Sequence, residues 1–166
     1  MQTIYLAGGC FWGTQRFFDQ FPGVKRTQVG YANGRTEAPS YEDVRYRNTG
    51  HAETVRIDFD ESLISLEKLL DYYFLTVDPL SVNRQGEDEG TQYRTGVYYT
   101  DESLLPAIRQ RMAVEEEKVG APLAVEVLPL ENFWPAEEYH QKYLVKNPGG
   151  YCHIPAALMH LAEREK

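Results

Sequence analysis

A short apolar segment, a pair of glycines and a helical pattern follow one another at the start of the chain. Residues 3–7 are apolar and partly β-branched, which predicts a buried strand. Residues 15–21 place apolar side chains at helical spacing. Between them runs the segment Gly8-Gly9-Cys10-Phe11-Trp12-Gly13, whose glycines permit a tight turn. The pattern therefore predicts an α/β or α+β fold in which Cys10 stands where a strand leads into a helix.

The position of Cys10 has chemical consequences for its thiol. The free N–H groups and the dipole of a helix start stabilise negative charge, which would lower the pKa of this cysteine from its usual value of about 8.5. Phe11 and Trp12 are large aromatic residues where a solvent-facing helix start would usually be polar. Two interpretations stay open here: a reactive thiol beside aromatic rings, or a structural cysteine at a buried corner.

The composition limits the class of protein. A chain of 166 residues fits one domain, residues 1–166, with a sizeable core. The net charge of −8 argues against a nucleic-acid partner, which would require a basic face. No apolar run approaches the roughly 18 residues that cross a membrane, and the first residues lack the basic region of a signal peptide. We therefore expect a cytoplasmic protein whose two cysteines are redox-active rather than structural.

Strands and helices alternate along the rest of the chain. Alternating or continuous apolar residues predict further strands at 24–31, 53–59, 95–100 and 123–128. Helical spacing and capping residues predict helices at 40–44, 65–77, 101–119 and 134–145, and a short one within 154–166. Residues 78–94 combine proline, glycine and charge with little periodicity, and a loop of this length is usually functional or disordered. The strand order is left open by these patterns.

Several motifs resemble those of the peptide methionine sulfoxide reductase A family. The segment Gly9-Cys10-Phe11-Trp12-Gly13 is similar to the family signature. Gly50-His51-Ala52-Glu53, residues 78–94, and the segment Asn147-Pro148-Gly149-Gly150-Tyr151-Cys152 follow in the family's order, so that the resemblance covers nearly the whole chain. It implies a two-layer fold, with a mixed sheet, flanking helices and a long irregular C-terminal segment. It also implies reduction of methionine sulfoxide, free or in proteins, by thiols alone, without a metal or other cofactor, and a preference for the S epimer.

The resemblance implies a role for the first cysteine and for one glutamate. Cys10 matches the nucleophile that attacks the sulfoxide sulfur and takes its oxygen as a sulfenic acid, a reversible oxidation state. Glu53 matches the residue that gives a proton to this oxygen. Such an acid must be protonated at working pH, so burial would have to raise its pKa. Without the resemblance, Glu53 would be interpreted as a surface residue at a strand end.

Five further residues match the family's substrate site. Tyr41 and Tyr93 match two tyrosines that donate hydrogen bonds to the sulfoxide oxygen. Asp88 matches an acidic residue that binds the substrate backbone, and Phe11 and Trp12 fit as walls of a pocket for the S-methyl group. Taken alone, the tyrosines would be packing residues and Asp88 a solvated carboxylate.

The second cysteine matches the family's resolving thiol. Cys152 follows Gly149 and Gly150, and this pliable setting would allow it to reach Cys10 and form a disulfide. Some relatives carry another cysteine further on, whereas the tail of this chain holds none. The Cys10–Cys152 disulfide would then be reduced by an external dithiol, for which we expect thioredoxin. We expect the enzyme to be a monomer.

Two other classes of function remain as alternatives. A cysteine hydrolase would use Cys10 activated by His51 or His140, and it would need an oxyanion hole. A non-enzymatic interaction domain would simply bury or join the two cysteines. The spacings of His51, His140 and His153 match no zinc pattern, and we expect His51 to fix its loop by hydrogen bonding.

Overall fold

A six-stranded mixed sheet forms the centre of the protein, for which a computed structural model describes residues 1–164. Its strand order is β7-β6-β1-β3-β2-β8, and only β6 and β7 run parallel. The strands are β1 (Gln2–Ala7), β2 (Val24–Ala32), β3 (Ala52–Phe59), β6 (Gly96–Tyr99), β7 (Glu126–Pro129) and β8 (Phe133–Pro135). Two short strands, β4 (Arg84–Gln85) and β5 (Asp88–Glu89), pair in a separate hairpin.

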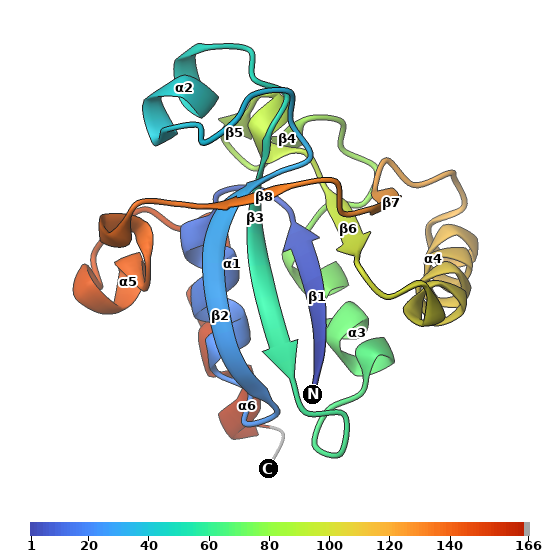
Figure 1. Cartoon of the computed structure of the whole chain (residues 1–166). Coiled ribbons are helices and arrows are strands. Elements are labelled where there is room, and N and C mark those ends of the chain that lie inside the picture. The colour runs from blue at the N-terminus through green and yellow to red at the C-terminus, as the bar shows by residue number, and fades with distance from the viewer. Residues whose placement is uncertain (165–166) are drawn as a thin grey trace.

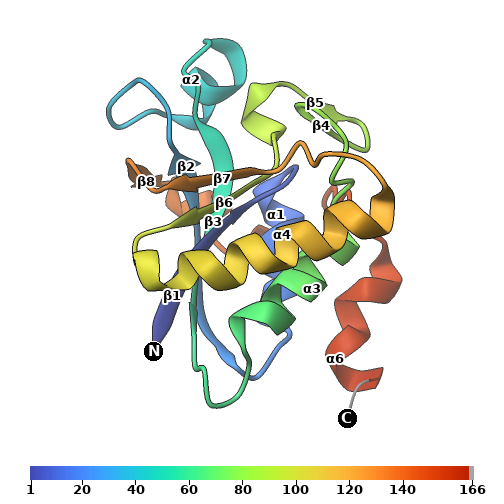
Figure 2. The ribbon, with the colours of Figure 1, turned by 90° about the vertical axis from the view of Figure 1, so that its right-hand side faces the viewer.

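Helices cover one face of this sheet. The α-helices are α1 (Phe11–Asp19), α2 (Tyr41–Tyr46), α3 (Leu66–Thr76), α4 (Leu105–Val119), α5 (Tyr143–Lys146) and α6 (Leu161–Arg164). Helices α1 and α3 lie against the sheet, and α4 packs beside α3 (Figures 1 and 2). This arrangement confirms the expected mixed sheet with flanking helices.

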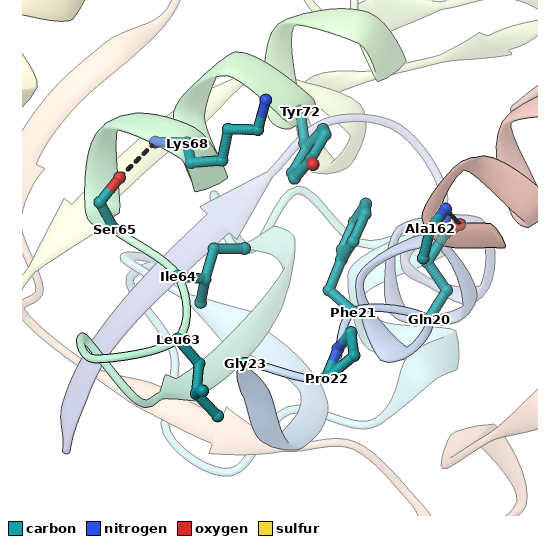
Figure 3. Close-up of a pocket in the computed structure, with 10 residues that line it drawn as sticks. All are labelled: Gln20, Phe21, Pro22, Gly23, Leu63, Ile64, Ser65, Lys68, Tyr72 and Ala162. Atoms are coloured by element: carbon teal, nitrogen blue, oxygen red, sulfur yellow. Dashed lines mark hydrogen bonds between the residues drawn. The ribbon is translucent and has the colours of Figure 1, made fainter. Parts of the chain in front are cut away.

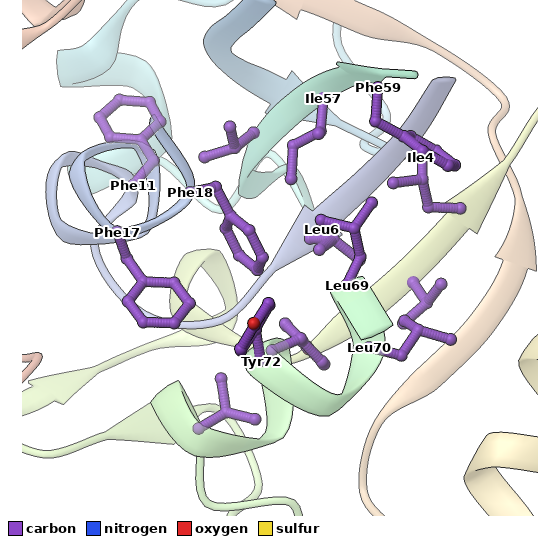
Figure 4. Close-up of a cluster of buried hydrophobic side chains, with 14 of the residues drawn as sticks. Ile4, Leu6, Phe11, Phe17, Phe18, Ile57, Phe59, Leu69, Leu70 and Tyr72 are labelled. Atoms are coloured by element: carbon purple, nitrogen blue, oxygen red, sulfur yellow. The ribbon is translucent and has the colours of Figure 1, made fainter. Parts of the chain in front are cut away.

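Alternation along β1 explains how the layers are joined. Ile4 and Leu6 are fully buried in the main core, where Leu6 lies toward Phe18 of α1 and Ile4 lies beside Phe59 of β3 (Figure 4). Tyr5 and Ala7 point to the opposite face and belong to a smaller cluster. Because successive side chains of a strand alternate between faces, the apolar run of β1 supplies both clusters and is buried on both sides. The first strand is thereby fixed in the middle of the sheet.

The single helix predicted over residues 134–145 is wrong for most of its length: a 3-10 turn covers Glu138–His140, and only the end lies in a helix, α5. Residues Phe133–Pro135 form the edge strand β8, which pairs with the end of β2. Aromatic residues favour strands, and proline is tolerated at a sheet edge because an edge strand leaves one side without ladder bonds. The Gln141 amide then bonds to both backbone groups of Val29, accepting its N–H and donating to its carbonyl at 3.0 Å each. Lys142 follows with a φ of 56°, so no helix could run through this segment.

Other boundaries differ in smaller ways. The strand expected at 123–128 runs from Glu126 to Pro129, beside β6. The expected loop 78–94 contains the β4–β5 hairpin and a 3-10 turn, Thr91–Tyr93. The helix expected at 101–119 begins with the 3-10 turn Glu102–Leu104, capped by Asp101, before α4. The tail forms a 3-10 turn, Ala156–His160, and then α6, while residues 165–166 lie outside the described part of the chain.

Several of these elements meet at one end of the molecule. The end of β1, the start of α1 and the start of β3 lie together near α2 and the β4–β5 hairpin, at the top of Figure 1. The predicted serine caps are present, since Ser40 forms a capping box at α2 and Ser65 caps α3. The fold thus gathers residues from three distant parts of the chain (α2, β3 and the β4–β5 hairpin) around the corner at Cys10.

Candidate active site

Cys10 is the residue from which α1 starts. It adopts an extended conformation at the N-cap, with φ −64° and ψ 127°, and only 7% of it is exposed. Gly9 before it has a φ of 80°, a conformation that L side chains rarely adopt. A Cβ at that glycine would lie 2.8 Å from Nε2 of His153. The glycine is therefore required both for the turn and for close approach of the C-terminal segment.

Two carboxylates bind the first N–H groups of α1. The Cys10 N–H donates to Oδ2 of Asp88 at 3.3 Å, and the Phe11 N–H donates to Oε1 of Glu53 at 3.2 Å. These backbone donors have no partner within the helix, and carboxylates are stabilised there. The structure therefore brings Glu53 and Asp88, which are far apart in the chain, beside Cys10.

The expectation of a lowered thiol pKa is wrong. Burial raises the pKa of Cys10 well above its ordinary value, and the charge of Glu53 adds to this effect. A hydrogen bond from the backbone N–H of Trp12 lowers the pKa of Cys10, but by less than these two effects raise it. The N–H groups at the helix start, which would stabilise a thiolate, instead bind the side chains of Asp88 and Glu53. Negative charge on these two side chains disfavours a thiolate beside them. The resting site therefore holds a protonated thiol.

Glu53 has the protonation behaviour that its predicted role requires. It is 2% exposed, and burial raises its pKa to about 8. This value already includes a lowering by the hydrogen bond from the Phe11 N–H and a smaller rise from the charge of Asp88. At pH 7 a carboxyl group with this pKa is about nine-tenths protonated. A buried acid thus stands ready beside the start of α1.

Tyr41 and Tyr93 reach the same site from α2 and from the turn before β6. The pKa of Tyr41 is raised to about 12, first by burial and then by the charges of Glu53 and Cys10, while Arg45 acts in the opposite direction. The pKa of Tyr93 is raised for the same three reasons. The two hydroxyl groups are therefore protonated donors, in the electrostatic field of the thiol and the acid.

Trp12 belongs to a stack of aromatic rings. Its indole N–H donates to Nδ1 of His140 at 2.9 Å. Its ring stacks on Tyr143 with centroids 3.7 Å apart and planes at 12°. The ring of Tyr41 lies 4.5 Å from that of His140. Trp12 is half-buried, so the stack presents an apolar surface of the kind that sulfur and methyl groups favour.

Phe11 differs from Trp12 in its surroundings. It is 1% exposed, and its ring packs against Tyr31 and His140 at 5.7 and 5.3 Å between centroids. It therefore offers almost no surface to a ligand and supports the site from within the core. A role for Phe11 in a methyl pocket stays a prediction.

Sequence reasoning missed the part that three residues play in this site. His140 and Tyr143 fix Trp12, and Glu137 accepts the Tyr31 hydroxyl at 2.9 Å and the Tyr41 N–H at 3.1 Å. All three follow the edge strand β8, in the segment for which the sequence predicts one helix. A helix over this segment would point these three side chains in other directions, and no short sequence motif identifies them.

Cys152 lies against the first turn of α1. It is a free thiol, half-buried, and its Sγ donates weakly to the Ile154 carbonyl at 3.5 Å. A Cβ at Gly13 would lie 2.8 Å from this Sγ. The second cysteine is thus held next to the helix that Cys10 begins, as a resolving thiol requires.

Each histidine that a hydrolase would use has one ring nitrogen in a hydrogen bond to a residue other than Cys10. Nε2 of the His51 ring lies 2.7 Å from the Thr36 carbonyl, and the backbone N–H of His51 donates to the Thr49 hydroxyl. These bonds confirm the expected role of His51 in fixing its loop. His140 Nδ1 accepts the bond from Trp12. Within residues 1–164, no group of three acidic, histidine or cysteine side chains could hold a metal ion.

A cavity of about 1070 Å³ lies at the opposite end of α1 (Figure 3). Phe21, Ile64 and Tyr72 supply its apolar lining, and Lys68 lies at its edge. It contains none of the predicted site residues. In the same described part of the chain, no helix combines the length and the apolar character needed to cross a membrane.

Comparison with known proteins gives consistent matches. A family model described as peptide methionine sulfoxide reductase matches residues 2–166. Peptide methionine sulfoxide reductase MsrA of Clostridium acetobutylicum is 57% identical over 159 residues, which cover 96% of this chain and 98% of that protein. The reduced form of Mxr1 from Saccharomyces cerevisiae superposes with a TM-score of 0.86 at 37% identity, covering 91% of this chain and 88% of the other. A structure of Mxr1 in complex with Trx2 shares the fold, with a TM-score of 0.56 at 23% identity over 86% of this chain and 84% of the other.

Proposed function

The chain belongs to the peptide methionine sulfoxide reductase family, and on that premise we propose that Cys10 and its neighbours form the site at which it reduces methionine S-sulfoxide to methionine. The protein is thus a peptide-methionine (S)-S-oxide reductase that uses thiols. The observation that carries the assignment of the site is Glu53, a buried acid with a pKa of about 8 that binds the N–H next to Cys10. An acid of this kind is what the leaving oxygen of a sulfoxide needs.

In the first step, Cys10 Sγ attacks the sulfoxide sulfur. Glu53 protonates the oxygen, which moves to Cys10, and the proton of the thiol returns to Glu53. Methionine sulfur is reduced and Cys10 is oxidised to a sulfenic acid, so that atoms and electrons balance. The raised pKa of the Cys10 thiol means that this proton stays in place until the substrate has bound.

The surrounding residues bind different parts of the substrate. Tyr41 and Tyr93 donate hydrogen bonds to the oxygen as negative charge develops on it. Trp12, held flat by Tyr143, contacts the S-methyl group, with Phe11 packed behind it as core. Asp88 contacts the backbone of the substrate. The same sites accept methionine sulfoxide in proteins and as the free amino acid.

In the second step, Cys152 displaces the oxygen from Cys10 as water and forms a disulfide. Its position against Gly13 supports this assignment, because the thiol already lies on the first turn of α1. The sequence contains only these two cysteines, so the disulfide must be reduced from outside. A thioredoxin, the class of dithiol that reduces such bonds and that the complex of Mxr1 with Trx2 illustrates, completes the cycle. No metal or other cofactor is needed, since thiols supply every electron.

The proposed roles are tested by one turnover without an external reductant. The reduced protein is mixed with an excess of each epimer of N-acetylmethionine sulfoxide, and product and free thiols are measured together. We expect about one methionine per chain and the loss of both thiols with the S epimer. Cys10→Ser should abolish the product. Methionine formation by that variant would contradict the proposed nucleophile, and an unchanged thiol content would favour the hydrolase or interaction-domain interpretations.

Some expectations concern the whole protein rather than the site. We propose a single domain over residues 1–166 that acts as a cytoplasmic monomer. The net charge of −8 supports the absence of a nucleic-acid partner. Light scattering of the reduced and oxidised protein would test the oligomeric state.

A further inference from the structure

His153 is a buried side chain that the reaction above does not use. It directly follows Cys152, and its side chain is only 3% exposed. Neither ring nitrogen has a hydrogen-bond partner of normal geometry, although the Gly8 carbonyl lies close enough to favour the protonated ring. Burying an imidazole without hydrogen bonds costs free energy, so such a group in a reaction site calls for a chemical explanation.

The ring lies between the second thiol and the start of α1. Both side chains lie close to Gly13. A Cβ added to this glycine would be 2.8 Å from Cys152 Sγ and 3.4 Å from His153 Nδ1. The other ring nitrogen, Nε2, lies over Gly9. Nδ1 is therefore the nitrogen on the side of the thiol, and the two glycines leave room for the imidazole to cover the backbone of Cys10.

The second cysteine needs help to lose its proton. Burial raises the pKa of the Cys152 thiol, so very little thiolate is present at neutral pH. The His153 ring is neutral there, because burial lowers its pKa, and a neutral imidazole has a free lone pair. Asp88 Oδ2 lies 3.9 Å from Nδ1, where its charge would stabilise the imidazolium that forms.

We propose that His153 is the general base of the second step and takes the proton from Cys152 Sγ as this thiol attacks the Cys10 sulfenic acid. The S–S bond forms while the S–O bond of Cys10 breaks. Cys152 sulfur is oxidised, Cys10 sulfur is reduced, and the proton held by His153 passes to the leaving oxygen, which departs as water. This inference rests on the roles proposed above for the two cysteines.

The pH dependence follows from the groups that face this ring. The titratable groups near this ring and the two thiols are Cys10, Arg16, Asp88, Tyr151 and Cys152. Asp88 is the one whose charge acts on the pKa of His153. With His153 neutral, disulfide formation should be nearly independent of pH from 7 to 9. Without it, the rate should follow the thiolate of Cys152 and rise about tenfold per pH unit over the same range.

The experiment separates the two steps in a single turnover. Methionine formation and thiol loss are followed for the wild type, His153→Ala and His153→Gln, with the exposed His160→Ala as the control in the same C-terminal segment. At pH 7 we expect His153→Ala and His153→Gln to form methionine, with loss of the Cys10 thiol, at the wild-type rate. They should lose the second thiol, that of Cys152, about 10²-fold more slowly. Their Cys10 sulfenic acid should accumulate and be trapped by dimedone.

Two further readouts distinguish a base from a residue that only fills space. Added imidazole should restore fast disulfide formation to His153→Ala, and both variants should gain the tenfold rise per pH unit. Fast loss of the Cys152 thiol in either variant, or slow loss of it with a flat pH profile and no rescue, would overturn the inference. Failure of the wild type to form methionine would instead refute the proposed function, so the two failures can be told apart.

Discussion

Replacement of Glu53 by glutamine should make the protein less active and more stable. Glutamine has the same shape and keeps an oxygen that can accept the Phe11 N–H, now 3.2 Å from the carboxylate. It has no acidic proton to give to the substrate oxygen. The loss of general acid catalysis should slow methionine formation by about 10²- to 10⁴-fold.

The gain in stability follows from the raised pKa of Glu53. Its pKa is about 8 in the folded protein, against 4.5 for a fully solvated glutamate of the kind found in an unfolded chain. The unfolded state therefore releases this proton at lower pH, and the free energy of unfolding of the wild type decreases as the pH rises from 4.5 to about 8. The decrease is about 1.4 kcal/mol per pH unit, which gives about 3 kcal/mol at pH 7 and somewhat more at pH 8. Glu53→Gln does not titrate and escapes this loss.

Urea unfolding of the reduced protein at several pH values measures the difference. The free energy of unfolding of Glu53→Gln should equal that of the wild type near pH 4 and exceed it increasingly up to pH 8. Glu117→Gln, an exposed change on α4, is the matched control and should leave the pH profile unchanged. A constant difference between Glu53→Gln and the wild type across this range would mean that Glu53 ionises normally in the fold, and the argument for a neutral buried acid would fail.

Further predictions concern the binding groups and the second thiol. Gly13→Ala places a Cβ 2.8 Å from Cys152 Sγ, so loss of the Cys152 thiol in a single turnover should slow while methionine formation and loss of the Cys10 thiol continue; loss of the Cys152 thiol at the wild-type rate would show that the contact is unimportant. Tyr41→Phe and Tyr93→Phe each remove one donor to the developing oxyanion and should lower kcat/KM about 10-fold or more, measured with N-acetylmethionine sulfoxide; an unchanged value would exclude the hydroxyl group concerned. Cys152→Ser should still form one methionine per chain but should not turn over with thioredoxin, and normal cycling would assign the resolving role elsewhere.

The start of the site could be predicted from local sequence. The run of residues around Cys10 combines a strand, a glycine turn and a helix, and each part is determined by neighbours in the chain. The position of Cys10 at the first turn of α1 follows from these local preferences. The thiol pKa does not, because it depends on burial and on carboxylates that arrive from β3 and β5.

The segment after β7 shows where local patterns fail. Residues 134–145 have apolar spacing compatible with a helix, yet the free edge of β2 pairs with Phe133–Pro135 and the Gln141 amide bonds to Val29. The partner strand lies about one hundred residues earlier, so no window of the sequence contains it. The same pairing brings Glu137 and His140 to Tyr41 and Trp12.

The sequence by itself thus determined the mixed fold, the corner at Cys10 and, through its resemblance to a known family, the residues expected to form the site. Only the tertiary structure decided their protonation and their contacts. It buried Glu53 so that its pKa rises to about 8, and it placed Cys152 and the unpartnered His153 against α1. Propensity and spacing act between neighbours in the chain, whereas desolvation and charge act between neighbours in space.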